Sequence, residues 1–496
     1  MRPYGMRLIL WLALGLLPSL SLHAAMLRAG VASADITDRS IPVNDPCFAK
    51  VLLLEQEGRR VALITMDVVA IGGIGRIGDG FLEGLRRELA VNPGIEPERV
   101  LVNASHCHGV VRGDVQQLVV AAVRQAASSL VEVQAGSGNG REEGISENRR
   151  MWLQDGTQAD MRRAYSMPWD QQVKATGPID PQIGILRLDD LQGRPVAVVY
   201  HFACHPIMNP PSKGNSADYP GFASAAIEKA TGATALFLQG CGGDINPRHY
   251  KEVSRPADAK PLGLQLAASV LGALRQIKTS PAGWLRSQRE IIEVPRAGDY
   301  DQRIAALKLE QQRLLKALRP TNINFKSFLP LLLSQRLFPD MPSHYAQGYM
   351  DQPQAFKGFD LDNRVQVEAY LKNLETMEQL TRLGSNLALL EKNRALTQQA
   401  ASQALRAEVC ALGVGDFKWV SFPGEVTVQV GLNIKKQFGD AHAHVSGYTN
   451  GYLYYTATRE QRLNRGYAQE DCDVLVSPEW QAGFEAKALE LLQRLK

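Results

Sequence analysis

Between residues 26 and 285, short apolar runs alternate with longer segments whose apolar residues recur at helical spacing. Runs that predict strands buried on both faces lie at residues 51–54, 61–66, 100–104, 183–188, 196–202 and 235–238. Segments that predict helices lie at residues 115–131, 223–230 and 262–277. This alternation predicts an α/β fold, and ligand sites in such folds usually lie just beyond the ends of strands.

A different pattern begins near Asp301 and predicts a helical insertion over residues 301–408. Within it, residues 365–407 lack proline and are rich in Leu, Ala, Gln and Glu, which predicts one long helix or two stacked helices. The apolar stretch at 325–338 has two interpretations, a lid that faces lipid or a packed part of the core. From Val409 onward the strand pattern returns, and we expect this last part of the chain to rejoin the first sheet.

Composition excludes several classes of protein. The 496 residues are 45% hydrophobic and 21% charged, so the chain can bury a core and is not disordered. Lys and Arg number 55 against 51 Asp and Glu, a net charge of +4, and no five like charges occur in a row. A nucleic-acid partner or a polybasic contact with lipid is therefore excluded.

The N-terminus has the pattern of a secretory signal peptide. Arg2 and Arg7 lie at the start of an apolar stretch that runs to Leu22, and the small residues Ala24 and Ala25 follow it. The alternative is an uncleaved anchor, but the stretch is short for a span of about 20 apolar residues. We therefore predict a signal peptide at residues 1–24 and an exported mature chain, periplasmic or secreted, with no later membrane-spanning segment.

Six cysteines leave two interpretations open. An oxidising compartment would allow disulfides, and the spacing does not reveal which pairs would form. Buried free thiols are the alternative, and the absence of a CxxC motif gives no support to a zinc ribbon. The cysteines are Cys47, Cys107, Cys204, Cys241, Cys410 and Cys472.

Two pairs of histidines follow predicted strands. His106 and His108 close one strand at a spacing of two, so both side chains can point to one face. His201 and His205 flank the end of another strand, where the chain turns at Pro206. Neutral imidazole is the common ligand for hydrolytic zinc, and hydrogen-bonded histidines at strand ends are the alternative.

Two further segments carry candidate polar groups. Residues 239–248 place glycines and Asp244 after a strand, which is typical either of a ligand-binding turn or of a turn with an Asx cap. Glu425 follows a Pro-Gly pair at a strand end, a place that suits a carboxylate ligand. The nearby tyrosines at 452–455 favour an aromatic wall, and His442 and His444 are interpreted as the start of a surface strand, outside the site.

Several motifs, in their order along the chain, together resemble the neutral (non-lysosomal, neutral/alkaline) ceramidase family. They lie at residues 30–37 (GVASADIT), 64–67 (ITMD), 105–109 (SHCHG), 146–149 (SENR), 203–206 (ACHP), 216–221 (SADYPG), 243–247 (GDINP), 423–425 (PGE) and 450–460. The resemblance spans nearly the whole mature chain apart from the insertion. It implies a mixed-sheet α/β catalytic domain over residues 25–496 that contains the helical insertion.

The resemblance also implies a zinc site and catalytic roles. The implied zinc ligands are His106, His205, Glu425 and Tyr455. His108 would handle protons, Tyr455 would also belong to the catalytic set, and Arg149 would contact the substrate or its oxyanion. The groups expected on the substrate or oxyanion side are Gly240, Gly243, Asp244 and Asn246.

The sequence departs from the pattern of that family at several places. Asn246 occupies the place of a serine, and the chain ends where those enzymes continue into a C-terminal domain. We therefore expect a zinc-dependent amidohydrolase that cleaves an N-acyl, lipid-like amide with a water that zinc activates. The alternatives are an esterase or amidase acting on another cell-envelope substrate, and a non-catalytic envelope binding protein in which zinc is structural.

Overall fold

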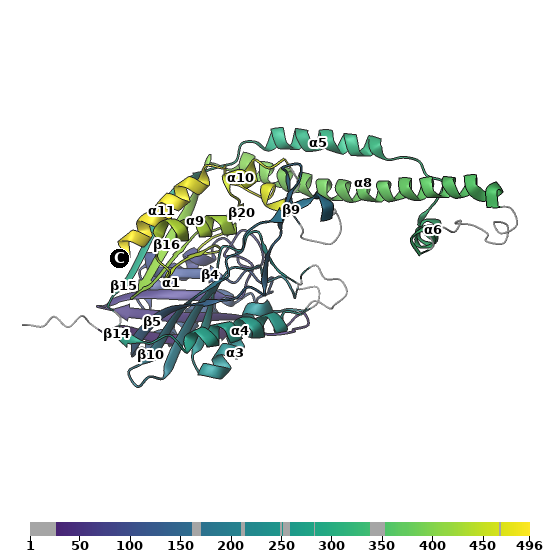
Figure 1. Ribbon diagram of the computed structural model, residues 1–496. Helices are drawn as coiled ribbons and strands as arrows, with labels where there is room; N and C mark the ends of the chain where they lie inside the picture. Colours follow the sequence, from purple (N-terminus) through teal and green to yellow (C-terminus); the bar gives the residue numbers. More distant parts are fainter. Residues whose placement is uncertain are drawn as a thin grey trace, which may run out of the picture.

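Two β-sheets pack face to face between two layers of helices (Figure 1). The computed structural model describes residues 26–160, 170–209, 214–248, 250, 258–281, 283–337, 353–465 and 468–496. The predicted signal peptide lies outside the described residues. Within them, no helix combines the length and the apolar character that crossing a membrane requires.

The first sheet contains nine strands in the order β12-β11-β10-β5-β1-β2-β3-β4, with β14 paired to β5. Its strands are β1 (Arg28–Asp35), β2 (Phe48–Gln56), β3 (Arg59–Met66), β4 (Val100–Ala104), β5 (Val131–Arg141), β10 (Gln182–Asp190), β11 (Pro195–Phe202), β12 (Thr234–Gln239) and β14 (Ser280–Pro281). The pairs β3–β4 and β11–β12 are parallel, and the other pairs are antiparallel. The expected mixed-sheet α/β fold is confirmed.

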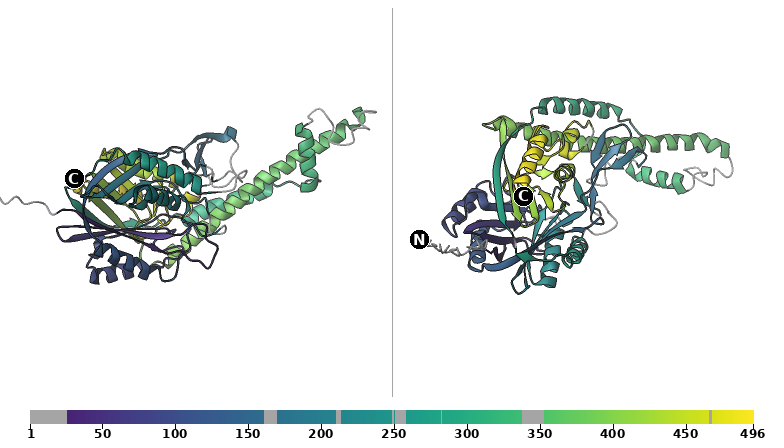
Figure 2. Two further views of the ribbon diagram at one scale, coloured as in Figure 1. Left: turned by 90° about the horizontal axis from the view of Figure 1, so that it is seen from below. Right: turned by 60° about the vertical axis from the view of Figure 1, so that its left-hand side comes forward.

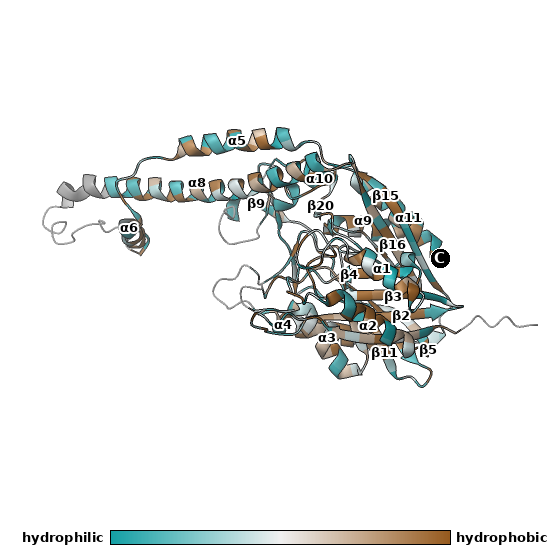
Figure 3. Ribbon diagram, turned by 180° about the vertical axis from the view of Figure 1, so that it is seen from behind, coloured by the Kyte–Doolittle hydropathy of each residue, from teal (hydrophilic) through white to brown (hydrophobic). Residues whose placement is uncertain are grey.

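Strand β2 shows why the apolar runs are continuous. Val51 and Leu53 face the helical layer, whereas Leu52 and Leu54 face the second sheet. Because both faces are buried, the middle of the strand needs no polar residues, and Figure 3 shows β2 and β3 as largely apolar.

Helices cover the outer face of the first sheet in two pairs. Helices α1 (Phe81–Val91) and α2 (Val115–Ser128) share a core with β1–β4. Helices α3 (Asp218–Thr231) and α4 (Lys260–Leu274) share one with β10–β12. Helical spacing of apolar residues, as at Val119 and Val123 of α2, produces each buried stripe.

The second sheet corrects the expectation that the chain after Val409 rejoins the first sheet. It has the order β15-β16-β17-β19, and helices α9 and α11 cover its outer face. Strand β15 lies just before the insertion, and β16 lies just after it. The two strands pair along the whole length of β15, so the chain after the insertion joins β15 and not the first sheet. The bounds are β15 (Leu285–Pro295), β16 (Ala404–Val414), β17 (Phe417–Ser421), β19 (Ala443–Ser446), α9 (Val428–Phe438) and α11 (Trp480–Arg494).

Three helices of the insertion lie within the described residues between β15 and β16, and they extend away from the sheets (Figures 1 and 2). They are α5 (Tyr300–Ala317), α6 (Phe325–Leu337) and α8 (Pro353–Gln399). The proline-free stretch lies in the single long helix α8 up to Gln399, but its last residues, 404–407, already belong to strand β16. Helix α6 contacts α8 through Phe328, whose ring lies 4.6 Å from that of Tyr370, and exposes other apolar residues such as Phe325.

Short elements complete the fold around the strand ends. They are β6 (Ser146–Asn148), β7 (Arg150–Leu153), β8 (Gln158–Asp160), β9 (Val173–Thr176), β13 (Ile245–Pro247), β18 (Glu425–Val426), β20 (Tyr455–Thr456) and α10 (Arg459–Arg462). All six cysteines are buried free thiols.

His444 corrects a second expectation, because it lies fully buried on β19 instead of at the surface. Neither of its ring nitrogens has a hydrogen-bond partner among the described residues. Burial lowers the pKa of His444 well below its usual value, with smaller effects from the imidazole of His201 and from Lys435, His442 and Lys418. The ring therefore stays neutral and packs 5.2 Å from that of Phe417.

Replacing His444 with phenylalanine should stabilise the fold by about 1–3 kcal/mol at pH 7, because it removes unpaired buried nitrogens. The unfolded chain binds a proton at His444 below about pH 6.5 and the folded chain does not, so stability at this position falls as pH decreases. The advantage of His444→Phe should therefore grow between pH 7 and pH 5. Urea unfolding at both pH values measures it, and a variant less stable than wild type at pH 5 would contradict this explanation.

Candidate active site

His106 follows the end of β4 in a left-handed backbone conformation, with φ of 66°. Its ring Nδ1 lies 2.6 Å from the carbonyl oxygen of Val69, to which it can donate. That bond leaves Nε2 as the nitrogen that faces the other site residues. His108 is also in the site, but both histidines lie beyond the strand, so strand alternation does not bring them together as expected.

His205 follows β11, at the turn before Pro206, and its Nδ1 contacts the carbonyl oxygens of Gly242 at 2.5 Å and Ile245 at 3.2 Å. The backbone N–H of His205 also donates to Ile245 (3.0 Å). The glycine-rich turn after β12 therefore orients this imidazole through its carbonyl groups.

Glu425 opens β18, which pairs in parallel with β20, opposite Tyr455. Its Oε2 lies 3.0 Å from Nε2 of His205 and 3.3 Å from Nε2 of His106. Its other oxygen, Oε1, accepts a hydrogen bond from the hydroxyl of Tyr452. One carboxylate therefore faces two imidazoles while a phenol fixes its orientation.

These three side chains form a cluster whose ligand atoms lie within 4.8 Å of one another. Each of the three residues is at most 3% exposed. Burial lowers the pKa of His205 to about 3 despite the attraction of Glu425, so its imidazole is neutral near pH 7, the form that binds metals. Burial opposes the charge on Glu425, but His106 and His205 outweigh it and hold its pKa well below the usual value. Two imidazoles and a carboxylate are a donor set that suits zinc.

One segment of the chain, residues 446–450, brings the three ligands together. Ala104 at the end of β4 donates to the carbonyl of Tyr448 (3.0 Å), and Gly240 after β12 forms a bridge with Ser446. Tyr448 in turn donates to the carbonyl of Gly424, next to Glu425 (3.1 Å). The ends of two strands of the first sheet and the start of β18 are therefore held against a common segment.

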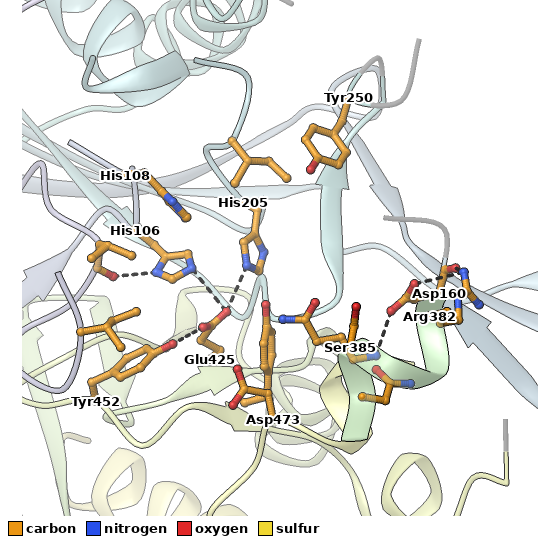
Figure 4. Close-up of a pocket in the computed structure, with 16 residues that line it drawn as sticks. His106, His108, Asp160, His205, Tyr250, Arg382, Ser385, Glu425, Tyr452 and Asp473 are labelled. Carbon is orange, nitrogen blue, oxygen red and sulfur yellow. Dashed lines mark hydrogen bonds and ion pairs between the residues drawn. The ribbon is translucent and has the colours of Figure 1, made fainter. Parts of the chain in front are cut away.

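The cluster lies in the wall of a cavity of about 470 Å³ (Figure 4). His108 also lines it, exposed to solvent, with its ring 5.8 Å from that of His106. Tyr455 lines it as well, and its ring stacks on that of His205 at 6.4 Å. The three candidate ligands thus face an open space that a substrate can enter.

Arg149, expected to touch the substrate, is fully buried behind Tyr455. Its guanidinium donates to Glu470 (2.5 Å), Asn246 (3.1 Å) and the carbonyl of Gly243 (2.6 Å), and a side-chain hydrogen bond links it to Tyr455. Burial opposes its charge, but Glu470 and Tyr455 raise its pKa well above the usual value. This position favours orientation of Tyr455 over contact with a substrate.

The four residues expected on the substrate side lie outside the lining of the cavity. The backbone N–H groups of Gly240 and Gly243 already donate to Phe202 and Val426, both at 2.9 Å. Neither N–H is therefore available to an oxyanion in this conformation.

The two polar residues of that set bind other parts of the protein. Asp244 accepts from the N–H of Val428 (2.8 Å), at the start of α9, and from Gln461 (3.1 Å). Asn246 accepts from Arg149. Their observed contacts hold the turn after β12 in place.

Two solved structures resemble this chain over most of its length. One is a neutral ceramidase from Pseudomonas aeruginosa, with a TM-score of 0.59, and the other is a ceramidase complexed with C2, with a TM-score of 0.58. The fold is that of a neutral ceramidase. Each alignment covers 95% of this chain and 75% or 76% of the other, at 17% sequence identity, so the likeness establishes the fold alone. No family model and no curated protein matches the sequence.

Within this ceramidase fold, the structure adds site residues that sequence reasoning missed. Tyr452 had been assigned to an aromatic wall, but it bonds the carboxylate of Glu425. Tyr448 packs its ring 4.4 Å from that of His106. Arg382 and Asn386 of α8 line the cavity although they lie in the insertion. Only the proximity of the tyrosines to the Pro-Gly-Glu motif gave a signal in the sequence.

Replacing Tyr452 with phenylalanine should weaken metal binding about 10- to 100-fold, because the carboxylate of Glu425 loses the hydrogen bond that orients it. Competition with a chelator of known affinity measures the change. Tyr454→Phe is the control, because the ring of Tyr454 lies 5.0 Å from that of Tyr452 and does not line the cavity. Equal metal affinities for both variants would show that this hydrogen bond does not support the site.

Proposed function

We propose that this chain is an exported zinc-dependent hydrolase that cleaves the amide bond of an N-acyl substrate. The observation that carries the proposal is the buried cluster of His106, His205 and Glu425 in the cavity wall of a ceramidase fold. Export, to the periplasm or outside the cell, rests on the signal pattern of residues 1–24.

The position of the cluster favours catalysis over a structural zinc. A structural zinc site is closed to solvent, whereas a catalytic site keeps a position open to water or substrate, which can be a fifth position. All three clustered residues line the cavity, as does Tyr455, which we propose as the fourth ligand. Buried on one side and open on the other, this arrangement is typical of a hydrolytic site.

Zinc bound at this site would act as a Lewis acid, which polarises an amide carbonyl and makes a water molecule acidic enough to attack it near neutral pH. The protein's part is to hold the donor atoms in place. Carbonyl groups of Val69 and Gly242 fix the two imidazoles, and Tyr452 fixes the carboxylate. Such outer contacts keep each donor atom directed at the metal.

Two further side chains complete the proposed mechanism. His108 is exposed in the cavity close to His106, and we assign it the transfer of a proton to the departing amine. Arg149 places its charge 5.3 Å from the ring of Tyr455, where it stabilises negative charge on the phenol oxygen. Arg149 thus acts on the reaction through Tyr455.

Amide cleavage is supported by the two structural neighbours, both of which are ceramidases. The test is hydrolysis of a fatty-acyl p-nitroanilide by purified mature protein, before and after removal of metal by a chelator. Activity should disappear with the metal and return when zinc is added. Hydrolysis that persists in metal-free protein would refute the proposal, and so would the absence of hydrolysis by zinc-loaded protein across acyl chain lengths.

A further inference from the structure

Helix α8 of the insertion supplies part of the active-site cavity. Arg382, Ser385 and Asn386 line the cavity from one face of this helix, because residues three and four apart lie side by side on a helix. Figure 4 shows Arg382 and Ser385 across the cavity from His106 and His205. The far wall of the cavity is therefore built by the insertion.

Asn386 stands out on this wall because its side-chain amide has no hydrogen-bond partner among the described residues, although it is only 4% exposed. Two neighbouring polar side chains on α8 donate hydrogen bonds within the protein, although Oδ1 of Asn393 has no partner among the described residues. Ser385 donates to the carbonyl of Thr381 (3.2 Å), and Asn393 donates to Asp473 (3.0 Å). An amide that lines a cavity and has no protein partner can bond a ligand that enters the cavity.

The charged groups around Asn386 are paired with one another, and this limits the kind of substrate group that the site can bind. Asp160 has Arg382 at 3.5 Å and the N–H of Gln469 at 2.8 Å, and Asp473 has Lys392 at 2.7 Å. The free hydrogen-bonding capacity at Asn386 is therefore that of a neutral amide, which both donates and accepts. Such a group fits a hydroxyl or an amide better than an ion.

We infer that Asn386 determines specificity by binding a neutral hydroxyl or amide group on the substrate, beyond the bond that is cleaved. The inference rests on the proposed function, and it names the substrate class as an amide whose polar end carries such a group. The alternative substrate is an amide whose amine part is an unsubstituted alkyl chain. Such a substrate would leave the side chain of Asn386 without a hydrogen-bond partner. The wild-type protein should therefore prefer the polar substrate by about tenfold or more in kcat/KM.

The test compares N-octanoyl serinamide with N-octanoyl butylamine, which share an acyl chain. Asn386→Leu should raise KM for the serinamide about tenfold, leave the butylamine unchanged, and keep or raise the melting temperature. Thr381→Val is the control, because this hydroxyl is exposed on α8 and already donates to Met377 (2.9 Å). Equal losses on both substrates, or a fall of several degrees in melting temperature, would overturn the inference.

Calorimetric binding of the same two amides separates this inference from the proposed hydrolysis. If neither amide is cleaved but Asn386→Leu weakens binding of the serinamide alone by about tenfold, the inference stands and the hydrolase proposal falls. If both are cleaved and Asn386→Leu changes neither binding nor KM, the hydrolase proposal stands and the inference falls.

Discussion

Replacing His205 with alanine is expected to abolish zinc binding and reduce kcat/KM for amide hydrolysis by about 10³-fold or more. His205 contributes a neutral Nε2 that lies 3.0 Å from Glu425, and its other nitrogen is held by two backbone carbonyls. Alanine removes the donor atom and leaves the rest of the turn in place. Metal content after dialysis and initial rates on an acyl anilide measure the two effects.

His442→Ala is the matched control for this prediction. His442 lies outside the cavity and contacts Ser137 through Nδ1 (2.9 Å), so its loss should leave metal content and rate within about twofold of wild type. A His205→Ala protein that retains stoichiometric zinc would exclude this residue as a ligand. Retained zinc with lost activity would assign it another role.

Replacing Arg149 with methionine is expected to destabilise the fold by about 3–5 kcal/mol, because Glu470 loses its closest charge partner in a fully buried site. Arg150 also contacts Glu470 at 3.2 Å, but it forms a shorter pair with Asp471 (2.7 Å). The variant also frees Tyr455 and Asn246 from the guanidinium, so activity should fall even where the protein remains folded. Urea unfolding and activity assays at 15 °C report the two effects separately.

The double variant Arg149→Met/Glu470→Leu distinguishes a charge effect from general damage to the core. Removing both partners leaves no unpaired charge, so most of the lost stability should return while activity stays low. If the double variant is less stable than the single one, the loss arises from packing. A single variant as stable as wild type would show that the ion pair is energetically neutral.

Much of the fold could be predicted from local pattern. The run at 100–104 coincides with β4, and the run at 196–202 lies within β11. The second sheet could not be predicted this way, because its longest pairing joins β15 to β16 across the whole insertion. Pairing between segments so far apart in the sequence depends on how the elements pack, and local hydrophobic periodicity gives no information about it.

The candidate ligands could be named in advance because each belongs to a motif that resembles one of the neutral ceramidase family. The structure brings His106, His205 and Glu425 together, and Tyr455 lines the same cavity. His444 escaped prediction because a polar neighbourhood in sequence, Asp440 to His442, precedes a strand that packing buries. Asn386 could not be predicted as a site residue, because nothing in the sequence of a long helix shows which of its residues will lie beside a cavity.

Zinc stoichiometry and coordination in the purified mature protein test the metal centre most directly. Elemental analysis should find one zinc per chain. X-ray absorption at the zinc edge should then show two imidazole nitrogens and oxygen ligands at about 2.0–2.2 Å. A folded protein that binds no divalent metal after zinc loading, or one whose zinc is bound by sulfur at about 2.3 Å, would contradict this account.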